Sequence, residues 1–593
     1  MAEKVLIPTA VEETWPRRPK LKVLYLGPWC RRWENEALWQ SLGGETLPYH
    51  WDDRRKLQED FLRLSRFREE ALTALVRFLN RFHKTNYSNH FWRILIGPWL
   101  GYFVPILYDR WFTLTRAFQR HSIREVTIIE PPKNLAAENT RHFESQIHTD
   151  SWNERLFADL LSFQKRETSC TLHRIRIQRF LDQPPSPDWG RRLGRLTGRF
   201  LAAIAGSRRH FIYRSYLPWQ KEAQLRIRLR QIPWPEFGLP LPRSDKKRQR
   251  SLCALDNYGK SPQTFASILA AFLPRYLPKI FLEGFAGAIR GLRHAGLPSN
   301  PQTMVTSNAW CADDMFKIWC GFQAERKVPL IIGQHGGNDG TSLFNIMEEH
   351  QFKVADRVVT WGWQGEGKAS VKSQPAFNIK RLGQPWKPHA KGDALLVGVS
   401  LPRFFYQLYS MPIGAQWLDY FDGQCRFVRG LDWQIRKKLL VRLYQPDYGW
   451  RQKERWREKF PDLRIDEGHV KIDKLVRRSR LYISTYNATT FLESLHDNFP
   501  SLIFWNPRYF ELRESARPFF HALESAGIFH RTPESAANHL NFHWERLEEW
   551  WSGDHVQEAR RLFCHQYSRR CSRPLEVLKE ILEEAARPAL LPG

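Results

Sequence analysis

Short apolar runs, each ended by glycine, proline or a polar cluster, recur along the chain and predict buried strands. Several stretches between these runs carry apolar residues at every third or fourth position, which predicts helices. The clearest unit is a strand at 304–307, a helix at 313–326 and a strand at 329–333. This order and spacing predict a βαβ unit, and therefore a parallel sheet.

The alternation of strands and helices continues on both sides of this unit. Before it, the pattern predicts strands at 22–26 and 125–130 and helices at 60–82 and 152–180. After it, the pattern predicts a helix at 488–495 and strands at 357–360, 394–399, 439–443, 481–485 and 501–505. Two such runs predict an α/β protein with two facing Rossmann-like lobes, parallel sheets and a ligand-binding cleft between the lobes.

The same pattern suggests where the lobes begin and end. We expect an N-terminal extension at 1–20, an N-terminal lobe with helical and Pro/Arg-rich insertions at 21–355, and a C-terminal lobe at 356–560. A C-terminal helix and tail at 561–593 follow, and the helical part should pack back across the lobes. Residues 183–263 are rich in proline, arginine and lysine without a clean period, which predicts long connections at the rim of the first lobe.

Charge narrows the choice of partners. The 593 residues, too many for one compact core, include 91 Lys and Arg against 62 Asp and Glu, a net charge of +29. Such an excess attracts nucleic acid, the anionic inner face of a membrane, or acidic nucleotide and glycan substrates. The charges are scattered, and the sequence has no zinc-finger or RNA-recognition signature. We therefore expect an acidic substrate or a membrane surface, and no nucleic acid.

Cysteine use and apolar segments bear on the compartment. The eight cysteines form no CxxC pair, which argues against a disulfide framework and a structural zinc site. Residues 1–13 contain no signal-peptide core, and the apolar run at 94–107, which includes Pro98 and Pro105, is too short to span a bilayer. We expect this run to be buried in a cytoplasmic protein. Peripheral attachment to the inner face of the cytoplasmic membrane stays open.

A polar, glycine-rich loop follows the predicted strand at 329–333. It reads Gly333-Gln334-His335-Gly336-Gly337-Asn338-Asp339-Gly340. Its glycines let the backbone approach a ligand, and an imidazole at a strand end can act as a base or contact a phosphate. The alternative is a glycine-rich turn whose histidine only forms hydrogen bonds. Asp339 and Asp150 are acidic alternatives for the base.

A second polar loop, 484–490, follows a predicted strand in the C-terminal lobe. Hydroxyls and N–H groups at the start of the next helix form an anion site, which suits a nucleotide phosphate. The candidates are Ser484, Thr485, Asn487, Thr489, Thr490 and, one turn into the helix and placed for ribose hydroxyls, Glu493. Ordinary helix capping by Thr489 or Thr490 is the alternative. Arg442, after another predicted strand, is a further candidate for phosphate pairing.

Several catalytic motifs are missing from the sequence. It contains no GxGxxG, Walker P-loop, GxSxG or HExxH motif, and no Asp-x-Asp of the kind that holds a metal-bound diphosphate. We therefore expect no metal and no cofactor. Stabilisation of a leaving group would then depend on Arg442, hydroxyls and helix N–H groups, through electrostatic positioning.

Motifs in both halves of the chain resemble a known group of proteins. GQHGG (333–337), TWGW (360–363), VRLYQPDYGW (441–450) and STYNATTFLESL (484–495) look like the transferases of O-antigen and surface-carbohydrate gene clusters. ALWQSLGG (37–44), NYSNHFWRILIGPWL (86–100) and YDRWFTL (108–114) fit the same group. That group is distantly related to CDP-glycerol glycerophosphotransferases and to capsular Kdo and sialic-acid-type transferases.

The resemblance implies a GT-B fold, a nucleotide-activated donor, commonly CMP- or CDP-linked, and metal independence. It also implies that His335 serves as base or donor contact, and that Ser484 and Thr485 hold the nucleotide phosphate. The relatives often carry a His-Pro pair where this chain reads Tyr444-Gln445-Pro446, so that phosphate contact departs from the pattern.

Together these observations predict a metal-independent glycosyltransferase-type enzyme. It would transfer a sugar, with a CMP-linked acidic sugar favoured, to an O-antigen, lipopolysaccharide or other surface-polysaccharide acceptor, as a glycan or a lipid-linked glycan. The donor would lie on the C-terminal lobe with Gly336 and Gly337 beside it, and the acceptor on the N-terminal lobe. A glycerophosphate or polyol-phosphate transferase, and a non-catalytic glycan- or membrane-binding protein on the same fold, are the alternatives.

Overall fold

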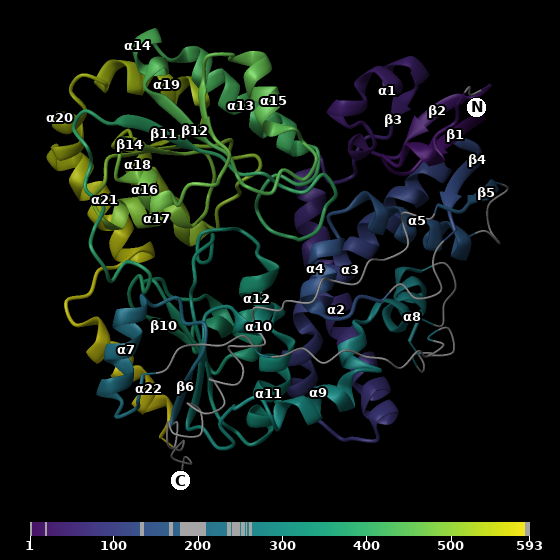
Figure 1. The fold of residues 1–593 in the computed structure, drawn as a ribbon, viewed down its shortest axis with the longest axis horizontal. Helices are drawn as coiled ribbons and strands as arrows, with labels where there is room; N and C mark the ends of the chain where they lie inside the picture. Colours follow the sequence, from purple (N-terminus) through teal and green to yellow (C-terminus); the bar gives the residue numbers. More distant parts are fainter. Residues whose placement is uncertain are drawn as a thin grey trace.

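The structure is a computed structural model that describes residues 3–17, 20–130, 136–164, 170–177, 209–233 and 264–587. Between 234 and 263 it also describes Leu239, Arg250, Leu255, Tyr258 and Gly259. The described strands form three parallel sheets of five, five and six strands. In Figure 1 the first sheet lies on the right, the second at lower left, and the third above the second.

The first sheet has the strand order β3-β2-β1-β4-β5. Its strands are β1 (Glu3–Ile7), β2 (Lys22–Tyr25), β3 (Glu45–Thr46), β4 (Ser122–Ile129) and β5 (Thr171–Ile175). Strand β1 pairs with β2 on one side and with β4 on the other. The expectation of an extension at 1–20 is therefore corrected, because this segment supplies the central strand of the sheet.

Two long helices between β3 and β4 fill the space between the first and second sheets (Figure 1). Helix α2 (Arg54–His83) begins after Asp53, whose side chain caps it by accepting from two backbone N–H groups. Helix α3 (Asn89–Arg120) continues through Pro98 and Pro105. By length and composition α3 passes as a membrane span, yet 89% of its apolar window is buried inside the protein. The apolar run at 94–107 is thus core, as expected.

The second sheet has its strands in sequential order, β10-β9-β8-β7-β6. They are β6 (His210–Ile212), β7 (Thr303–Thr306), β8 (Leu330–Gly333), β9 (Arg357–Thr360) and β10 (Ser373–Pro375). The predicted βαβ unit is confirmed as β7, α11 (Asp314–Glu325) and β8. The other helices of the first two sheets are α1 (Glu36–Leu42), α4 (Thr140–Gln146), α5 (Asp150–Gln164), α7 (Trp219–Arg228), α8 (Phe265–Tyr276), α9 (Phe285–Leu292), α10 (Ala309–Ala312) and α12 (Ile346–Val354).

The third sheet has the order β13-β12-β11-β14-β15-β16. After β11 the chain adds β12 and β13 on one side of it and then β14, β15 and β16 on the other, so the strand order reverses between β11 and β14. Its strands are β11 (Asp393–Val397), β12 (Leu439–Arg442), β13 (Arg464–Asp466), β14 (Ser479–Ser484), β15 (Ser501–Phe504) and β16 (Phe529–His530). Its helices are α13 (Gln416–Gly430), α14 (Trp433–Lys437), α15 (Gln452–Lys459), α16 (Ile472–Val476), α17 (Thr489–His496), α18 (Arg517–Ser525), α19 (Pro533–His543), α20 (Leu547–Ser552) and α21 (Asp554–Tyr567). Open α/β sheets bind ligands at such a reversal.

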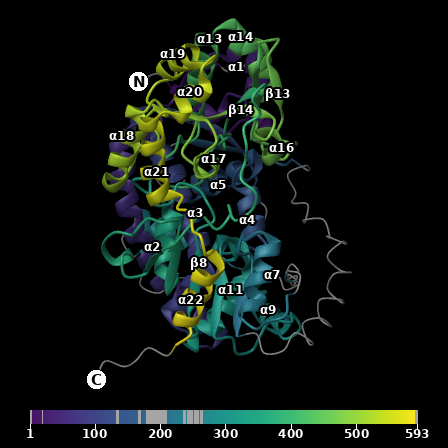
Figure 2. The same ribbon diagram turned by 90° about the vertical axis from the view of Figure 1, so that its left-hand side faces the viewer.

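Three apolar cores organise these layers. One joins the first sheet, α2 and α3 to one face of the second sheet, so these elements form a single N-terminal lobe. A second core lies within the third sheet and its helices, the C-terminal lobe. The third covers the other face of the second sheet with α7 and the last helix, α22 (Pro574–Ala585). Figure 2 shows α22 below α21, beside β8 of the N-terminal lobe.

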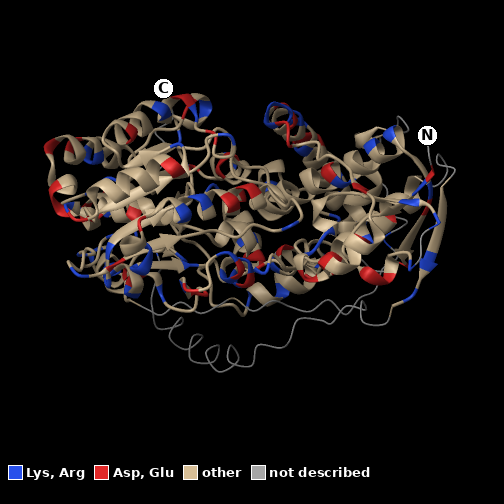
Figure 3. Ribbon diagram, turned by 90° about the horizontal axis from the view of Figure 1, so that it is seen from above, with Lys and Arg blue, Asp and Glu red and all other residues tan. Residues whose placement is uncertain are grey.

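The fold class predicted from the sequence is confirmed: an α/β protein with parallel sheets in two lobes, the GT-B-like arrangement that the resemblance implies. Strand β9 pairs with β8, and β10 pairs with β9, so both belong to the second sheet and the chain enters the C-terminal lobe after 375 rather than at 356. Most of 183–263, expected as connections, lies outside the described residues. Figure 3 shows basic and acidic residues interspersed along the described elements, as the scattered charges indicate.

Candidate active site between the lobes

A cleft of about 630 Å³ lies between the two lobes. From the N-terminal lobe it is lined by the turn after β8, from His335 to Asp339, and by α4, α10 and α12. From the C-terminal lobe it is lined by Tyr444 and Tyr448 after β12 and by Asn487 and Ala488 before α17. The two polar loops singled out in the sequence therefore face one cavity.

The two loops also bond to each other. The backbone N–H of Gly337 donates to Thr489 Oγ1 at 2.7 Å, and Asn487 Nδ2 donates to Thr341 Oγ1 at 3.0 Å. Gly336 has a φ of +138°, and a Cβ atom built on it would lie 2.3 Å from Thr489 Oγ1. Only glycine fits this close approach, so the glycines of the turn serve the contact between lobes.

The start of α17 faces this cleft at the reversal point of the third sheet. Its N-cap residue is Ala488, which provides no side-chain cap for the first-turn N–H groups. Uncapped N–H groups and the helix dipole favour an anion at this end. The helix begins directly after β14, which neighbours β11 at the reversal. This is the place where the sequence predicts a nucleotide phosphate.

His335 lines the cleft next to this helix end. Its Nδ1 atom is buried and has no hydrogen-bond partner among the described residues. Burial, and to a lesser extent the positive charge of Lys380, lowers the pKa of His335 to about 4. The imidazole is therefore neutral near pH 7 and able to accept a proton. Its ring contacts that of Tyr216, with centroids 5.8 Å apart.

Asp339 also lines the cleft but has the opposite protonation behaviour. Burial, reinforced by the nearby negative charge of Glu348, raises the pKa of Asp339 to about 8. Its two oxygens accept hydrogen bonds from Asn345 Nδ2 at 3.1 Å and from Gln351 Nε2 at 3.4 Å. At neutral pH this carboxyl group mostly keeps its proton, which makes it a poor base and a suitable hydrogen-bond donor.

Asp150 and Arg442 are among the candidates that lie outside the lining of this cleft. Asp150, at the start of α5, forms an ion pair with Arg403. Arg442, at the end of β12, lies 3.7 Å from the carboxylate of Asp466 and donates to the Val470 carbonyl oxygen at 3.4 Å. Both side chains are thus engaged in holding loops together, and neither is placed here as a base or a phosphate ligand.

The hydroxyl groups of the C-terminal loop are mostly used within the fold. Ser484 donates to the carbonyl oxygen of Tyr486 at 3.1 Å, and Thr485 donates to that of Val397 at 2.9 Å. Thr490 is half-buried in the first turn of α17. Glu493 is buried and forms an ion pair with Lys380 at 2.8 Å. Of the predicted donor ligands, Gly336, Gly337 and Asn487 line the cleft, and Thr489 contacts it through Gly337.

Comparison with known proteins decides the family. The model of the LIC12162 family transferases matches residues 4–582, nearly the whole chain. The chain belongs to the LIC12162 transferase family. It is therefore a transferase, as the sequence predicts.

Solved structures similar to this LIC12162 family transferase are remote. The spinosyn rhamnosyltransferase SpnG, complexed with spinosyn aglycone, is 11% identical, with 77% of this chain and 99% of that chain covered and a TM-score of 0.27. MurG of Acinetobacter baumannii is 13% identical, with 51% and 77% covered and a TM-score of 0.29. No curated protein matches the chain.

The cleft of this family member also contains residues that the sequence analysis missed. Glu144 on α4 and His148 just after it line the cleft, together with Arg141, Arg214 and five tyrosines: Tyr102, Tyr406, Tyr409, Tyr444 and Tyr448. The spacing of Glu144 and His148 places both on one side of a helical segment. Nothing local marks that segment as cleft-lining, because its position depends on packing against α3.

The described part of the chain contains no obvious set of metal ligands. Within the described ranges, no three His, Cys, Asp or Glu side chains are grouped as metal ligands. Metal independence stays a prediction. The groups that the described cleft does offer are a neutral imidazole, a protonated carboxyl, helix N–H groups and the guanidinium groups of Arg141 and Arg214.

Proposed function

We propose that this cleft transfers a sugar from a nucleotide-activated donor to a hydroxyl group of a surface polysaccharide or O-antigen acceptor. One observation supports this most: two polar loops from different lobes meet at the reversal point of a parallel sheet, with an uncapped helix start between them. A donor joins a nucleotide to a sugar, so it needs both a phosphate site and a reaction site in one cavity.

The donor phosphate would bind at the start of α17. The first-turn N–H groups supply hydrogen bonds without a competing side-chain cap. Arg214, on the opposite wall, supplies positive charge, and the +29 net charge attracts an acidic donor to the molecule. We favour a CMP-linked acidic sugar, because the resemblance implies CMP- or CDP-linked donors.

In the transfer step the bond between the anomeric carbon and the donor phosphate oxygen breaks, and a bond to the acceptor oxygen forms. His335 accepts the proton of the acceptor hydroxyl, since its imidazole is neutral and its Nδ1 has no partner in the described chain. The nucleotide leaves with the bonding electrons as its phosphate. Asp339, which keeps a proton at neutral pH, donates a hydrogen bond to the leaving group or the sugar.

The acceptor would be a glycan or a lipid-linked glycan of the cell surface, such as O-antigen, with the enzyme in the cytoplasm or on the inner membrane face. The resemblance supports the acceptor class, and the +29 charge supports contact with anionic lipid. If membrane contact is electrostatic, sedimentation with anionic vesicles should fall as salt rises.

Nucleotide binding gives the first test. A thermal-shift series with CMP, CDP, UDP and GDP should show stabilisation by one of them, with a shift that grows with concentration. If none stabilises the protein, the assignment of this cleft as the site for a donor with one of these nucleotides is wrong. Phosphorus analysis of the product then separates the two enzyme classes. A sugar transferred from CMP carries no phosphate into the product, whereas a glycerophosphate transferred from CDP-glycerol does.

A further inference from the structure

Near the C-terminal end of α4, the cleft is lined by aromatic rings from both lobes. The His148 ring lies edge-on to Tyr406 and to Tyr448, with centroids 4.9 Å and 5.3 Å apart. The ring of Tyr102, from α3, stacks on Tyr406 at 6.4 Å. The hydroxyl groups of Tyr406 and Tyr409 lie 2.8 Å apart. We call His148, Glu144, Tyr406 and Tyr448 the aromatic subsite.

The backbone of Tyr448 is strained. Its φ is +54°, a left-handed conformation that disfavours a side chain as large as tyrosine. The chain keeps it because Arg403 Nε donates to the Tyr448 carbonyl oxygen at 3.1 Å, while Arg403 also pairs with Asp150 of the N-terminal lobe. Strain of this kind gathers at binding sites, where it positions a side chain for a ligand.

The aromatic subsite also holds little charge. Burial alone lowers the pKa of His148 to about 4, so its ring is neutral. Burial raises the pKa of Glu144 to about 7, against the opposing pull of Lys317, so this carboxyl is partly protonated near neutral pH. Of the cations that line the cleft, Arg141 is exposed and Arg214 lies 3.5 Å from Asp313. A ligand here meets flat apolar rings and polar groups that are mostly uncharged.

Buried polar atoms in the cleft remain without partners. His148 Nδ1, Asn308 Oδ1 and Asn338 Nδ2 are buried, and none has a hydrogen-bond partner within the described residues. Buried polar atoms in folded proteins are nearly always satisfied, and leaving one unsatisfied costs about 1–3 kcal/mol. A bound polyhydroxyl compound would satisfy these atoms, because each sugar hydroxyl both donates and accepts a hydrogen bond.

We propose that the aromatic subsite binds an uncharged sugar ring, the terminal residue of the acceptor glycan, by stacking it on Tyr448 and Tyr406 and bonding its hydroxyls to His148 and Glu144. This inference rests on the proposed function for its meaning as an acceptor site. The sugar-binding property itself does not. Apolar faces of sugar rings suit tyrosine, which combines a flat ring with a polar tip. An acidic sugar or a phosphate does not suit it, because its charge would be desolvated next to Glu144.

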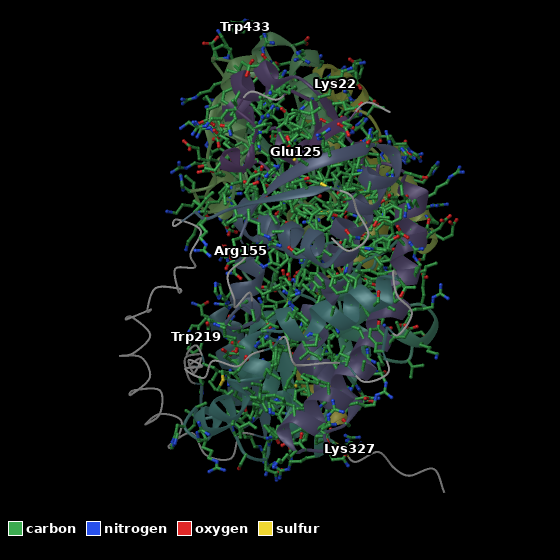
Figure 4. The ribbon with its side chains drawn as sticks, turned by 90° about the vertical axis from the view of Figure 1, so that its right-hand side faces the viewer. Lys22, Glu125, Arg155, Trp219, Lys327 and Trp433 are labelled. Carbon is green, nitrogen blue, oxygen red and sulfur yellow. The ribbon has the colours of Figure 1, made fainter. Side chains whose placement is uncertain are left out.

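Ligand-observed NMR on the intact chain gives the test, with methyl glycosides of hexoses and N-acetylhexosamines as probes and free N-acetylneuraminic acid as the acidic comparison. Wild type should transfer saturation to ring protons of at least one neutral glycoside. Tyr448→Ala and Tyr406→Ala should weaken its binding roughly three- to tenfold. Tyr448→Phe, which keeps the ring, should retain most of it. Trp433→Ala, on exposed α14 at the outer end of the C-terminal lobe (Figure 4), should bind as wild type does.

The outcomes separate this inference from the proposed function. Absence of any glycoside signal, equal binding by the tyrosine variants, or an acidic-sugar signal that exceeds the neutral one and is lost in Tyr448→Ala would each overturn the aromatic subsite. The nucleotide-induced thermal shift should persist in Tyr448→Ala, and this shift also shows that the variant is folded. Loss of the shift in wild type would instead overturn the donor site and leave the sugar-binding result standing.

Discussion

The two polar loops of the cleft both follow a buried strand, but their side chains have different roles. The turn after β8 keeps buried polar atoms of His335 and Asn338 without partners in the described chain. In the loop after β14 the hydroxyl groups form hydrogen bonds within the protein. Ser484 and Thr485 donate to backbone carbonyls, and Thr489 accepts from Gly337. What that loop leaves for a ligand is the backbone of α17.

Polar residues after a buried strand can therefore indicate where a site lies without identifying the groups that bind the ligand. A hydroxyl in a tight turn has nearby carbonyl groups to bond, and the turn depends on those bonds. An imidazole at a wider, glycine-rich turn has no such local partner and stays available. Mutations can test whether side chains of the turn after β8 take part in the reaction while hydroxyl groups of the loop after β14 stabilise the fold.

The largest effect is expected for His335→Ala. If His335 is the base, the variant should lose about 10²- to 10⁴-fold in turnover, while its folding and its nucleotide-induced thermal shift stay as in wild type. Release of the stabilising nucleotide from its sugar donor measures the turnover. His555→Ala on α21, an exposed histidine outside the cleft lining, is the matched control. Wild-type turnover in His335→Ala would move the base to another group, with Glu144 the next candidate.

Gly336→Ala should come next, because it forces the loops apart. The added Cβ would lie 2.3 Å from Thr489 Oγ1, at a φ of +138°. Strain of about 1–3 kcal/mol at this position should weaken nucleotide binding roughly tenfold to hundredfold. Isothermal titration with the stabilising nucleotide measures the change.

Two further variants check the cause of that loss. Gly383→Ala should bind normally, since no atom of the described residues lies within 4 Å of its added Cβ. The double variant Gly336→Ala with Thr489→Ala should recover part of the affinity, because it removes the atoms that obstruct the new methyl group. Full affinity in Gly336→Ala would show that contact between the loops is not needed to hold the donor.

An element could be predicted where neighbouring residues determine it, and could not where contacts between residues far apart in the sequence determine it. The strand-helix alternation predicted β7, α11, β8, β14 and α17, because each is marked by local apolar periodicity. It missed β1, whose three buried residues (Val5, Leu6 and Ile7) form a run too short to stand out and gain their burial from pairing with distant β4.

The candidate site divides in the same way. His335, Asp339 and Asn487 were predicted because they directly follow strands, and strand ends converge by topology. The aromatic subsite was missed because Tyr406 and Tyr448 belong to long connections that local patterns leave undetermined. Asp150 and Arg442 lie outside the cleft lining, and their side chains have nearby partners of opposite charge, which no periodicity reports.

Thr485→Val tests the scaffold role of the C-terminal loop. The change keeps the shape of the side chain but removes the hydroxyl that donates to the Val397 carbonyl oxygen at 2.9 Å and contacts the Tyr420 hydroxyl, which keeps, among the described residues, only the hydrogen bond it accepts from the Val399 N–H. It should lower the free energy of unfolding by about 1–3 kcal/mol in chemical denaturation. Nucleotide affinity should stay within about twofold of wild type. Thr485→Ser should restore stability, whereas a large loss of nucleotide affinity in Thr485→Val would return this hydroxyl to the phosphate site.

Asp339→Asn should give the smallest effect, and it appears in the pH dependence of stability. The folded pKa of Asp339, about 8, lies above the ordinary aspartate pKa of 3.8, so the folded protein holds a proton that the unfolded chain has released between those values. Raising the pH through this window therefore destabilises wild type, and stability should level off once the folded group has ionised above about pH 8. The asparagine variant mimics the protonated carboxyl and has no proton to lose. Its melting temperature should fall less than that of wild type between pH 6 and 9. Parallel curves for the two proteins would mean that Asp339 is ionised in the cleft and is itself available as a base.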